Sequence, residues 1–241
     1  MRTNSPTAAF ILGLLIALGL IGAAFLSGQA LLSFKDADRY VTVKGLAERE
    51  VDANLVIWPL SFAEAGNELP TLYEILQKRQ AAVTTFLTTS GILPTNITTN
   101  PPDITDFQAR KYNPANQQRQ HRYLARATLT VRSEHVDLVR QLMGKSSELI
   151  KQGIVLTGDE YQMRPEFLYT TLNSIKPDMI REATEGARKA AEQFARDSGS
   201  VVGKIRNARQ GMFSIVDRDR NSPYRKKIRV VTTVDYMLTD I

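Results

Sequence analysis

The side chains that could carry out chemistry in this sequence are few and widely spaced. There are two histidines, His121 and His135, and no cysteine, and no His-x-His or His-Glu-x-x-His pattern is present. Because a metal site needs closely spaced His, Cys or carboxylate ligands, the sequence predicts neither a metal site nor thiolate chemistry. We expect His135, at the start of a predicted helix, to cap that helix or to face solvent.

Carboxylates come close together in the chain at two places, Asp103 with Asp106 and Asp159 with Glu160. Both pairs fall where loops or strand ends are expected, and a general acid needs burial or a neighbouring charge to move its pKa. No Gly-x-Ser-x-Gly, phosphate-loop or Gly-x-Gly-x-x-Gly pattern occurs. The sequence therefore predicts a protein that is not an enzyme and that holds no cofactor.

A charged segment, residues 217–227, is the strongest candidate for a surface contact. Its Tyr224, Arg225, Lys226 and Lys227 could meet a lipid headgroup or an acidic patch on another subunit. The plainer interpretation of this segment is a solvated hairpin tip.

Aromatic side chains are the other candidates for contact with a partner protein or ligand. Trp58, Tyr112, Tyr123 and Tyr224 would serve in this way if they are exposed. The formal net charge of +6 is not concentrated in one long block, so we expect no nucleic-acid partner.

The N-terminal segment indicates on which side of a membrane the candidate residues lie. Residues 3–34 contain no Asp, Glu, Lys or Arg, and a helix of that length crosses a hydrocarbon core of about 30 Å. A signal peptide cleaved after Gly28-Gln29-Ala30 remains open, but the length favours an uncleaved signal-anchor.

We therefore expect residues 1–7 to be cytoplasmic and residues 8–34 to cross the inner membrane of a bacterium once. Residues 40–241 would then form an exported, periplasmic domain. Small residues recur four apart in the span, a spacing that lets helices approach closely in lipid. They predict helix packing and a homo-oligomer, and they are Ala9, Gly13 and Ala17 on one line, with Gly19 and Ala23 on another.

Strand and helix patterns alternate through the rest of the chain. Alternating apolar residues predict strands, and apolar residues at helical spacing, most followed by glycine, predict helices. The expected strands are 41–51, 55–62, 92–108 with a break, 123–131, 153–161, 167–172, 202–210 and 228–238, and the expected helices are 67–90, 133–150 and 177–198. This order predicts an α+β fold of repeated strand-helix-strand units, with helices packed on a largely antiparallel sheet and with edge strands available for pairing between chains.

Three local features refine this expectation. Gly45 interrupts the first strand and predicts a bulge or a close approach of another backbone. Pro59 lacks a ladder donor and predicts an edge or a bulge in the second strand. The third helix has a face made mainly of alanine, which predicts that it lies close against the sheet, and this face comprises Ile180, Ala183, Ala187, Ala190, Ala191, Phe194 and Ala195.

Two stretches resemble a known family. Residues 41–52, Val-Thr-Val-Lys-Gly-Leu-Ala-Glu-Arg-Glu-Val-Asp, are similar to the opening strand of the SIMPL domain family of exported bacterial proteins. Residues 187–204 are similar to its Ala-rich helix, Gly turn and following strand start. The resemblance covers about residues 40–238, with one departure: the proline expected near Asp52 is missing, and Trp58-Pro59 stands in the second strand instead.

The resemblance implies a periplasmic or surface protein linked to oxidative-stress protection, and at least one family member assembles into a large channel-like ring. It transfers no catalytic residue. We therefore expect a membrane-anchored, self-assembling envelope scaffold, and the alternative is a periplasmic binding or adaptor module for a partner protein or small ligand.

Overall fold

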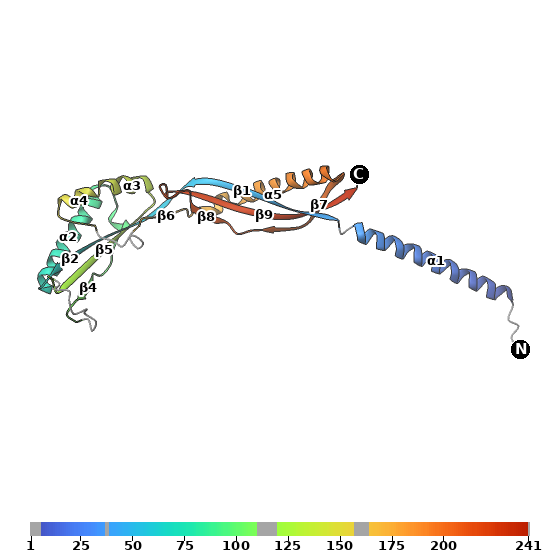
Figure 1. Ribbon diagram of the computed structural model, residues 1–241, viewed down its shortest axis with the longest axis horizontal. Helices are drawn as coiled ribbons and strands as arrows, with labels where there is room; N and C mark the ends of the chain where they lie inside the picture. The colour runs from blue at the N-terminus through green and yellow to red at the C-terminus, as the bar shows by residue number, and fades with distance from the viewer. Residues whose placement is uncertain (1–5, 37–38, 110–119, 157–163, 241) are drawn as a thin grey trace. The chain divides into compact units, whose positions relative to one another are not determined.

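The computed structural model describes residues 6–36, 39–109, 120–156 and 164–240. It has the predicted α+β class, with helices and two antiparallel sheets (Figure 1). The chain divides into two compact units, each built from separate segments. Unit 1 comprises residues 1–48, 175–214 and 229–241, and unit 2 comprises residues 49–174 and 215–228.

The apolar N-terminal segment forms one long helix, α1 (Pro6–Asp36). Phe10 and residues 13–28 of this helix are all exposed. Among the described residues, however, no helix meets the length and apolarity required to cross a membrane. The helix predicted over residues 8–34 is confirmed. That this helix crosses a membrane is not supported and stays a prediction.

The first sheet has the strand order β1-β9-β7, with β8 also paired to β9. Its strands are β1 (Tyr40–Asp52), β7 (Ser200–Gln210), β8 (Ser214–Asp217) and β9 (Arg225–Asp240). Within unit 1, helix α5 (Leu172–Asp197) packs on one face of this sheet. The buried cluster that joins them contains Val43, Ala187, Ala191, Val234 and Tyr236.

Gly45 marks a very close approach between β1 and α5. A Cβ atom built at Gly45 would lie 1.7 Å from the Ala183 carbonyl oxygen and 2.5 Å from the Ala187 amide nitrogen. Only glycine leaves room for the helix backbone here. The close approach predicted from the sequence is confirmed.

Two details of the predicted third helix are wrong. The helix begins at Leu172, a turn and a half before Pro177, which lies inside it; a proline there removes only one N–H from the helix ladder. Phe194 is 58% exposed. Successive helical residues are about 100° apart, so Phe194 lies beside the buried stripe and not within it.

The second sheet, in unit 2, has the strand order β3-β5-β2-β6, with β4 also paired to β5. Its strands are β2 (Leu55–Gly66), β3 (Ile97–Thr99), β4 (Asp103–Asp106), β5 (Tyr123–Ser133) and β6 (Glu166–Leu168). Strands β2 and β5 pair without interruption from Val56 opposite Ser133 to Gly66 opposite Tyr123. Pro59 causes no bulge, and in the described part of the chain β6 covers the other edge of β2 only at Leu55–Ile57, so Pro59 lies at a local edge.

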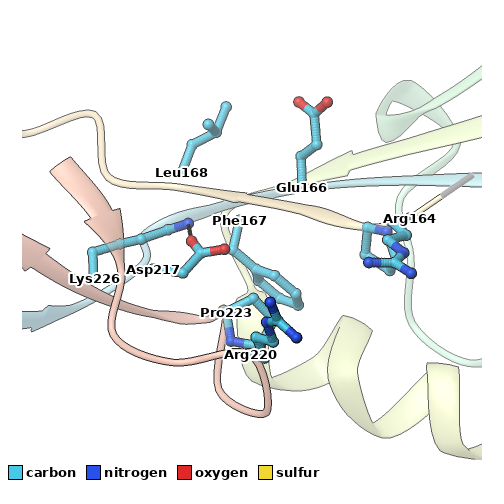
Figure 2. Close-up of a pocket in the computed structure, with 9 residues that line it drawn as sticks. Arg164, Glu166, Phe167, Leu168, Asp217, Arg220, Pro223 and Lys226 are labelled. Atoms are coloured by element: carbon cyan, nitrogen blue, oxygen red, sulfur yellow. Dashed lines mark hydrogen bonds and ion pairs between the residues drawn. The ribbon is translucent and has the colours of Figure 1, made fainter. Parts of the chain in front are cut away.

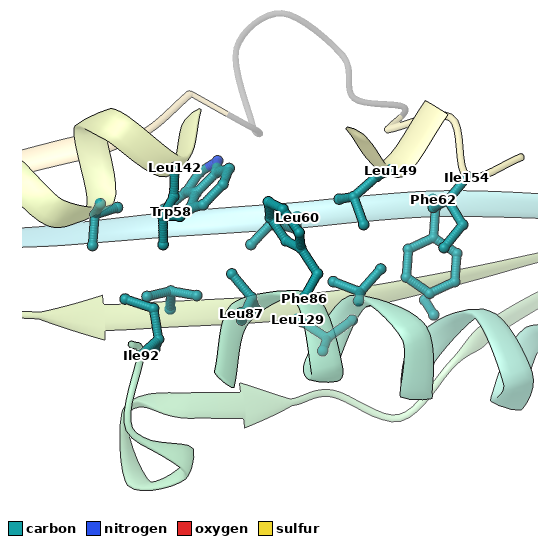
Figure 3. Packing of buried hydrophobic residues seen from close by; sticks show 14 of the residues in the cluster. Trp58, Leu60, Phe62, Phe86, Leu87, Ile92, Leu129, Leu142, Leu149 and Ile154 are labelled. Atoms are coloured by element: carbon teal, nitrogen blue, oxygen red, sulfur yellow. The ribbon is translucent and has the colours of Figure 1, made fainter. Parts of the chain in front are cut away.

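The core of unit 2 lies between this sheet and the helices α2 (Leu69–Thr89), α3 (Val136–Lys145) and α4 (Ser147–Lys151). Alternate residues of β2 and β5 face the helices, as the period-two pattern of 123–131 predicted for β5. Figure 3 shows this packing, to which Trp58, Leu60 and Phe62 contribute from β2, Leu129 from β5, Phe86 and Leu87 from α2, Leu142 from α3 and Leu149 from α4.

Three predicted elements of unit 2 differ from the structure. The helix predicted over 133–150 is divided at Ser146 into α3 and α4. The helix predicted from residue 67 begins only at Leu69, and the Asn67 side-chain oxygen accepts a hydrogen bond from the Arg122 amide at 3.0 Å. Of the strand predicted over 153–161, the described part contains one isolated bridge, between Leu156 and Phe62, and residues 157–161 lie outside the described residues.

Candidate binding and assembly surfaces

Within the part of the chain that the structure describes, the histidines and carboxylates singled out in the sequence do not come together. His135 is exposed directly before α3, and its amide donates to the Ser133 hydroxyl at 3.1 Å. His121 and Asp103 are exposed on other segments, and Asp159 with Glu160 lies outside the described residues. Across the described ranges, no three His, Cys, Asp or Glu side chains are grouped so that they could hold a metal ion.

Asp106 is held as an anion by Arg122. The Arg122 guanidinium donates from Nε at 3.2 Å and from Nη2 at 2.8 Å to the Asp106 Oδ2 atom. These hydrogen bonds hold the pKa of the Asp106 carboxyl below its usual range. A carboxylate stabilised in this way joins β4 to the start of β5 and is a poor general acid.

Trp58 does not meet the condition set for a contact residue. It is only 6% exposed and belongs to the core of unit 2. Its position on β2 opposite Val131 directs the indole toward the helices, because side chains alternate along a strand. Tyr123 is half-buried, with the Arg122 guanidinium 4.8 Å from its ring centre, and Tyr112 lies outside the described residues.

The charged segment 217–227 connects the paired strands β8 and β9 in unit 2, so it is a hairpin tip as interpreted, but one that is only partly solvated. The Lys226 side chain is only 9% exposed and its ammonium pairs with the Asp217 carboxylate. Arg225 is exposed, with its Nε 3.4 Å from the Asp52 Oδ1, and Lys227 is half-buried. Lys226 therefore does not project freely toward a partner, and contact through Arg225 and Lys227 stays a prediction.

Tyr224 attaches this turn to the rest of unit 2. The Arg140 guanidinium lies 3.5 Å from the centre of its ring, and the Phe167 ring meets it edge to face with the centres 6.2 Å apart. The Tyr224 carbonyl also accepts a hydrogen bond from the Ala53 amide at 2.7 Å. Stacking and main-chain pairing thus fix the position of the turn.

Asp219 organises the turn from within. Its carboxylate accepts hydrogen bonds from the Ser222 hydroxyl, from the Arg218 Nε at 2.9 Å and from the amides of Asn221 and Ser222 at 2.9 and 2.8 Å. The Ser222 hydroxyl and the Arg218 guanidinium, which favour the charged form most, lower the pKa of Asp219 to about 2. Asp219 is therefore a structural anion at neutral pH.

A pocket of about 830 Å³ lies between this turn and β6 (Figure 2). Phe167 points toward the turn, whereas Glu166 and Leu168 point to the other side of β6. The lining residues are Arg164, Pro165, Glu166, Phe167, Leu168, Asp217, Arg220, Pro223 and Lys226. The sequence reasoning named only the 217–227 side of this pocket. It took residues 167–172 as an ordinary strand, and no short motif distinguishes them.

The small residues of α1 are open to a neighbour. Gly13, Ala17, Gly19 and Ala23 are all exposed, and a Cβ atom built at Gly13 or Gly19 meets nothing within 4 Å. Ala9 belongs to the helix, but its side chain lies outside the described residues. These positions therefore have the room that close helix packing requires.

The two edges of the first sheet differ in how well they suit strand pairing. β7 has register shifts between Val202 and Ile205 and between Ile205 and Asn207, and it carries Lys204, Arg206 and Arg209. Bulges and basic side chains are the devices by which edge strands avoid pairing. β1 keeps a regular alternation of exposed and more buried residues at the other edge. Of the two edges, β1 is the better candidate for contact between chains.

The chain matches a known protein family. The model of the SIMPL family, described as a protein of unknown function (DUF541), matches residues 41–234, well over half of the chain. The resemblance predicted from residues 41–52 and 187–204 is thereby confirmed over nearly the same range. No curated protein matches the chain.

Proposed function

This chain belongs to the SIMPL family, and from that membership we propose that it is a non-enzymatic envelope protein that is anchored in the bacterial inner membrane and assembles into a homo-oligomer. The proposed scaffold lies in the periplasm and has the form of a ring or channel. A link to oxidative or envelope stress protection, implied by the family resemblance, is part of the same proposal.

The exposure of apolar side chains on α1 carries this proposal. Leu14, Leu18 and Leu26 are 53%, 58% and 67% exposed in the isolated chain. Exposed apolar surface of this extent is normally covered by lipid or by another protein surface. A bilayer would cover the outside of α1, and a second copy of α1 would cover the line of small residues.

The native mass of the full chain in detergent tests the assembly. Light scattering coupled to size-exclusion chromatography should give a defined particle of several chains. Gly13→Leu should reduce its mass, because it fills the space that a neighbouring helix backbone would occupy. Gly22→Leu is the matched control, since nine residues at about 100° each place it on the opposite side of α1. A monomer for the unchanged protein, or equal loss of mass in both variants, would contradict the proposal.

Membrane extraction tests the anchor. The full chain should stay with the membrane fraction after an alkaline carbonate wash, and protease added to spheroplasts should digest residues 40–241. Release of the intact chain into the wash would contradict an anchor. Protection of that domain from protease would place it on the cytoplasmic side.

The pocket beside β6 favours a second candidate function, a binding or adaptor module. Its volume lies within the range of about 300–1,000 Å³ that is usual for ligand sites. Its two walls are fixed by the contacts of Tyr224 and Asp219. This second function needs no assembly of the chain and could operate beside it.

A further inference from the structure

Strand β6 is the end strand of the second sheet. It pairs with β2 through Leu55–Ile57, and the strand order leaves its other edge unpaired within the described residues. Alternate residues of such a strand direct their N–H and C=O groups outward. Pro165, directly before β6, has no N–H, and the Leu168 carbonyl already accepts a hydrogen bond from the Asn54 amide at 2.9 Å on the β2 side. An added strand would therefore pair mainly with the main chain of Phe167.

The pocket follows this strand, so a segment that paired with β6 would lie within it. Figure 2 shows β6 crossing the pocket, with Phe167 directed toward Arg220 and Pro223. Phe167 is 7% exposed and forms an apolar floor. Every residue that lines the pocket belongs to unit 2.

The charges of the pocket favour an acidic side chain on the Phe167 side of β6. Lys226 and Asp217 pair with each other, and Glu166 points to the opposite side of the strand. Arg220 lines the pocket on the side toward which Phe167 is directed, and a guanidinium binds a carboxylate with two parallel hydrogen bonds. On the other side of β6, Glu166 would repel an acidic side chain of the added strand. Leu168, which is 38% exposed, favours an apolar side chain there.

We propose that the outer edge of β6 and the adjoining pocket bind an extended peptide segment, in which acidic and apolar residues alternate, as an additional β-strand. Main-chain hydrogen bonds to β6 give the affinity, and Arg220 selects the acidic residue. The Asp219 and Tyr224 contacts hold the turn in place before binding, which reduces the entropy lost on association. This inference rests on the second candidate function and is independent of membrane anchoring and assembly.

Fluorescence anisotropy on the full chain in detergent tests the proposal with labelled peptides. The probe is Val-Glu-Val-Glu-Val, compared with Val-Lys-Val-Lys-Val and with Val-Glu-Pro-Glu-Val, whose central proline removes a main-chain donor. The acidic peptide should bind at least about tenfold more tightly than either of the others, since a charged hydrogen-bonded contact is worth about that factor or more. Equal binding of the lysine peptide would overturn the role of charge, and equal binding of the proline peptide would overturn strand addition.

Arg220→Gln should weaken binding of the acidic peptide about tenfold and leave the lysine peptide unchanged. Arg209→Gln, an exposed arginine of β7 that does not line the pocket, is the matched control and should change neither. The proposal fails if Arg220→Gln has no effect or if no peptide binds at millimolar concentration. It also fails if concentrating the protein displaces the peptide, since a second copy would then occupy β6. The native mass of Arg220→Gln, measured alongside, tests assembly separately.

Discussion

The contact between β1 and α5 allows a sharp test at Gly45. In Gly45→Ala the new methyl group would lie 1.7 Å from the Ala183 carbonyl oxygen, and real contacts of this kind essentially never fall below 3.0 Å. The oxygen would have to withdraw by about 1.3 Å, and both close neighbours are backbone atoms that no rotamer change can move. The whole helix must therefore shift away from the strand.

The size of the effect follows from what this shift does to the cluster of Val43, Ala187, Ala191, Val234 and Tyr236. A gap of 0.5–1 Å already forfeits about a quarter to a half of each dispersion contact. Overpacking of a core costs about 1–3 kcal/mol and sometimes more, and we expect about 3 kcal/mol here. For a chain of this length that lowers Tm by about 6–12 °C.

Gly186→Ala provides the matched control in the same interface. A Cβ atom at Gly186 would lie 3.8 Å from the Gly45 Cα, an ordinary contact, and alanine is favoured over glycine in a helix by about 1 kcal/mol. Thermal unfolding followed by circular dichroism should therefore show a lower Tm for Gly45→Ala and an unchanged or higher Tm for Gly186→Ala. If Gly45→Ala melts within about 1 °C of the unchanged protein, the helix backbone does not press against β1 at this position.

Three further predictions concern the same two units. Ala191→Leu should destabilise unit 1 by about 1–3 kcal/mol in urea unfolding, and half-buried Ala190→Leu by clearly less; equal costs would contradict the packing of α5. Asp217→Asn should lower the free energy of unfolding by about 2 kcal/mol, because it leaves the Lys226 ammonium buried without its anion. This cost is smaller than for a fully buried pair, because the Asp217 side chain is half exposed to solvent. Lys226→Met removes that charge altogether and should cost less, and a larger loss in Lys226→Met would argue against this account. Asp219 has a pKa of about 2 in the folded chain, below the ordinary 3.8, so it stabilises the fold above about pH 4, and this contribution is lost as the pH falls through about 2. Acid titration of Tm should show a shallower loss in Asp219→Asn, and identical profiles would exclude the linkage.

Most elements were predictable because their signals are local. The alternation in 123–131 specifies which face of β5 is buried, and Gly199, with φ of +67°, ends α5 where the sequence places the stop. The boundaries were less certain, since Pro177 favours a helix start by its own geometry while the preceding residues continue the helix. Trp58 shows the same limit for a single side chain, because an aromatic residue on a strand suits a contact surface or a core equally well.

The sequence by itself determined the family, the α+β class and the helix over 8–34, since each depends on residue types at fixed spacing along one segment. At Gly45 it left a bulge and a close approach open, and the packing of α5 decided for the close approach. Only the tertiary structure decided which charges of 217–227 are buried, and that β6 forms an end strand beside a pocket. Those properties depend on residues more than forty positions apart in the chain, such as Phe167 and Tyr224, whose rings meet edge to face. Burial and pairing across that separation arise from packing, and no local pattern encodes them.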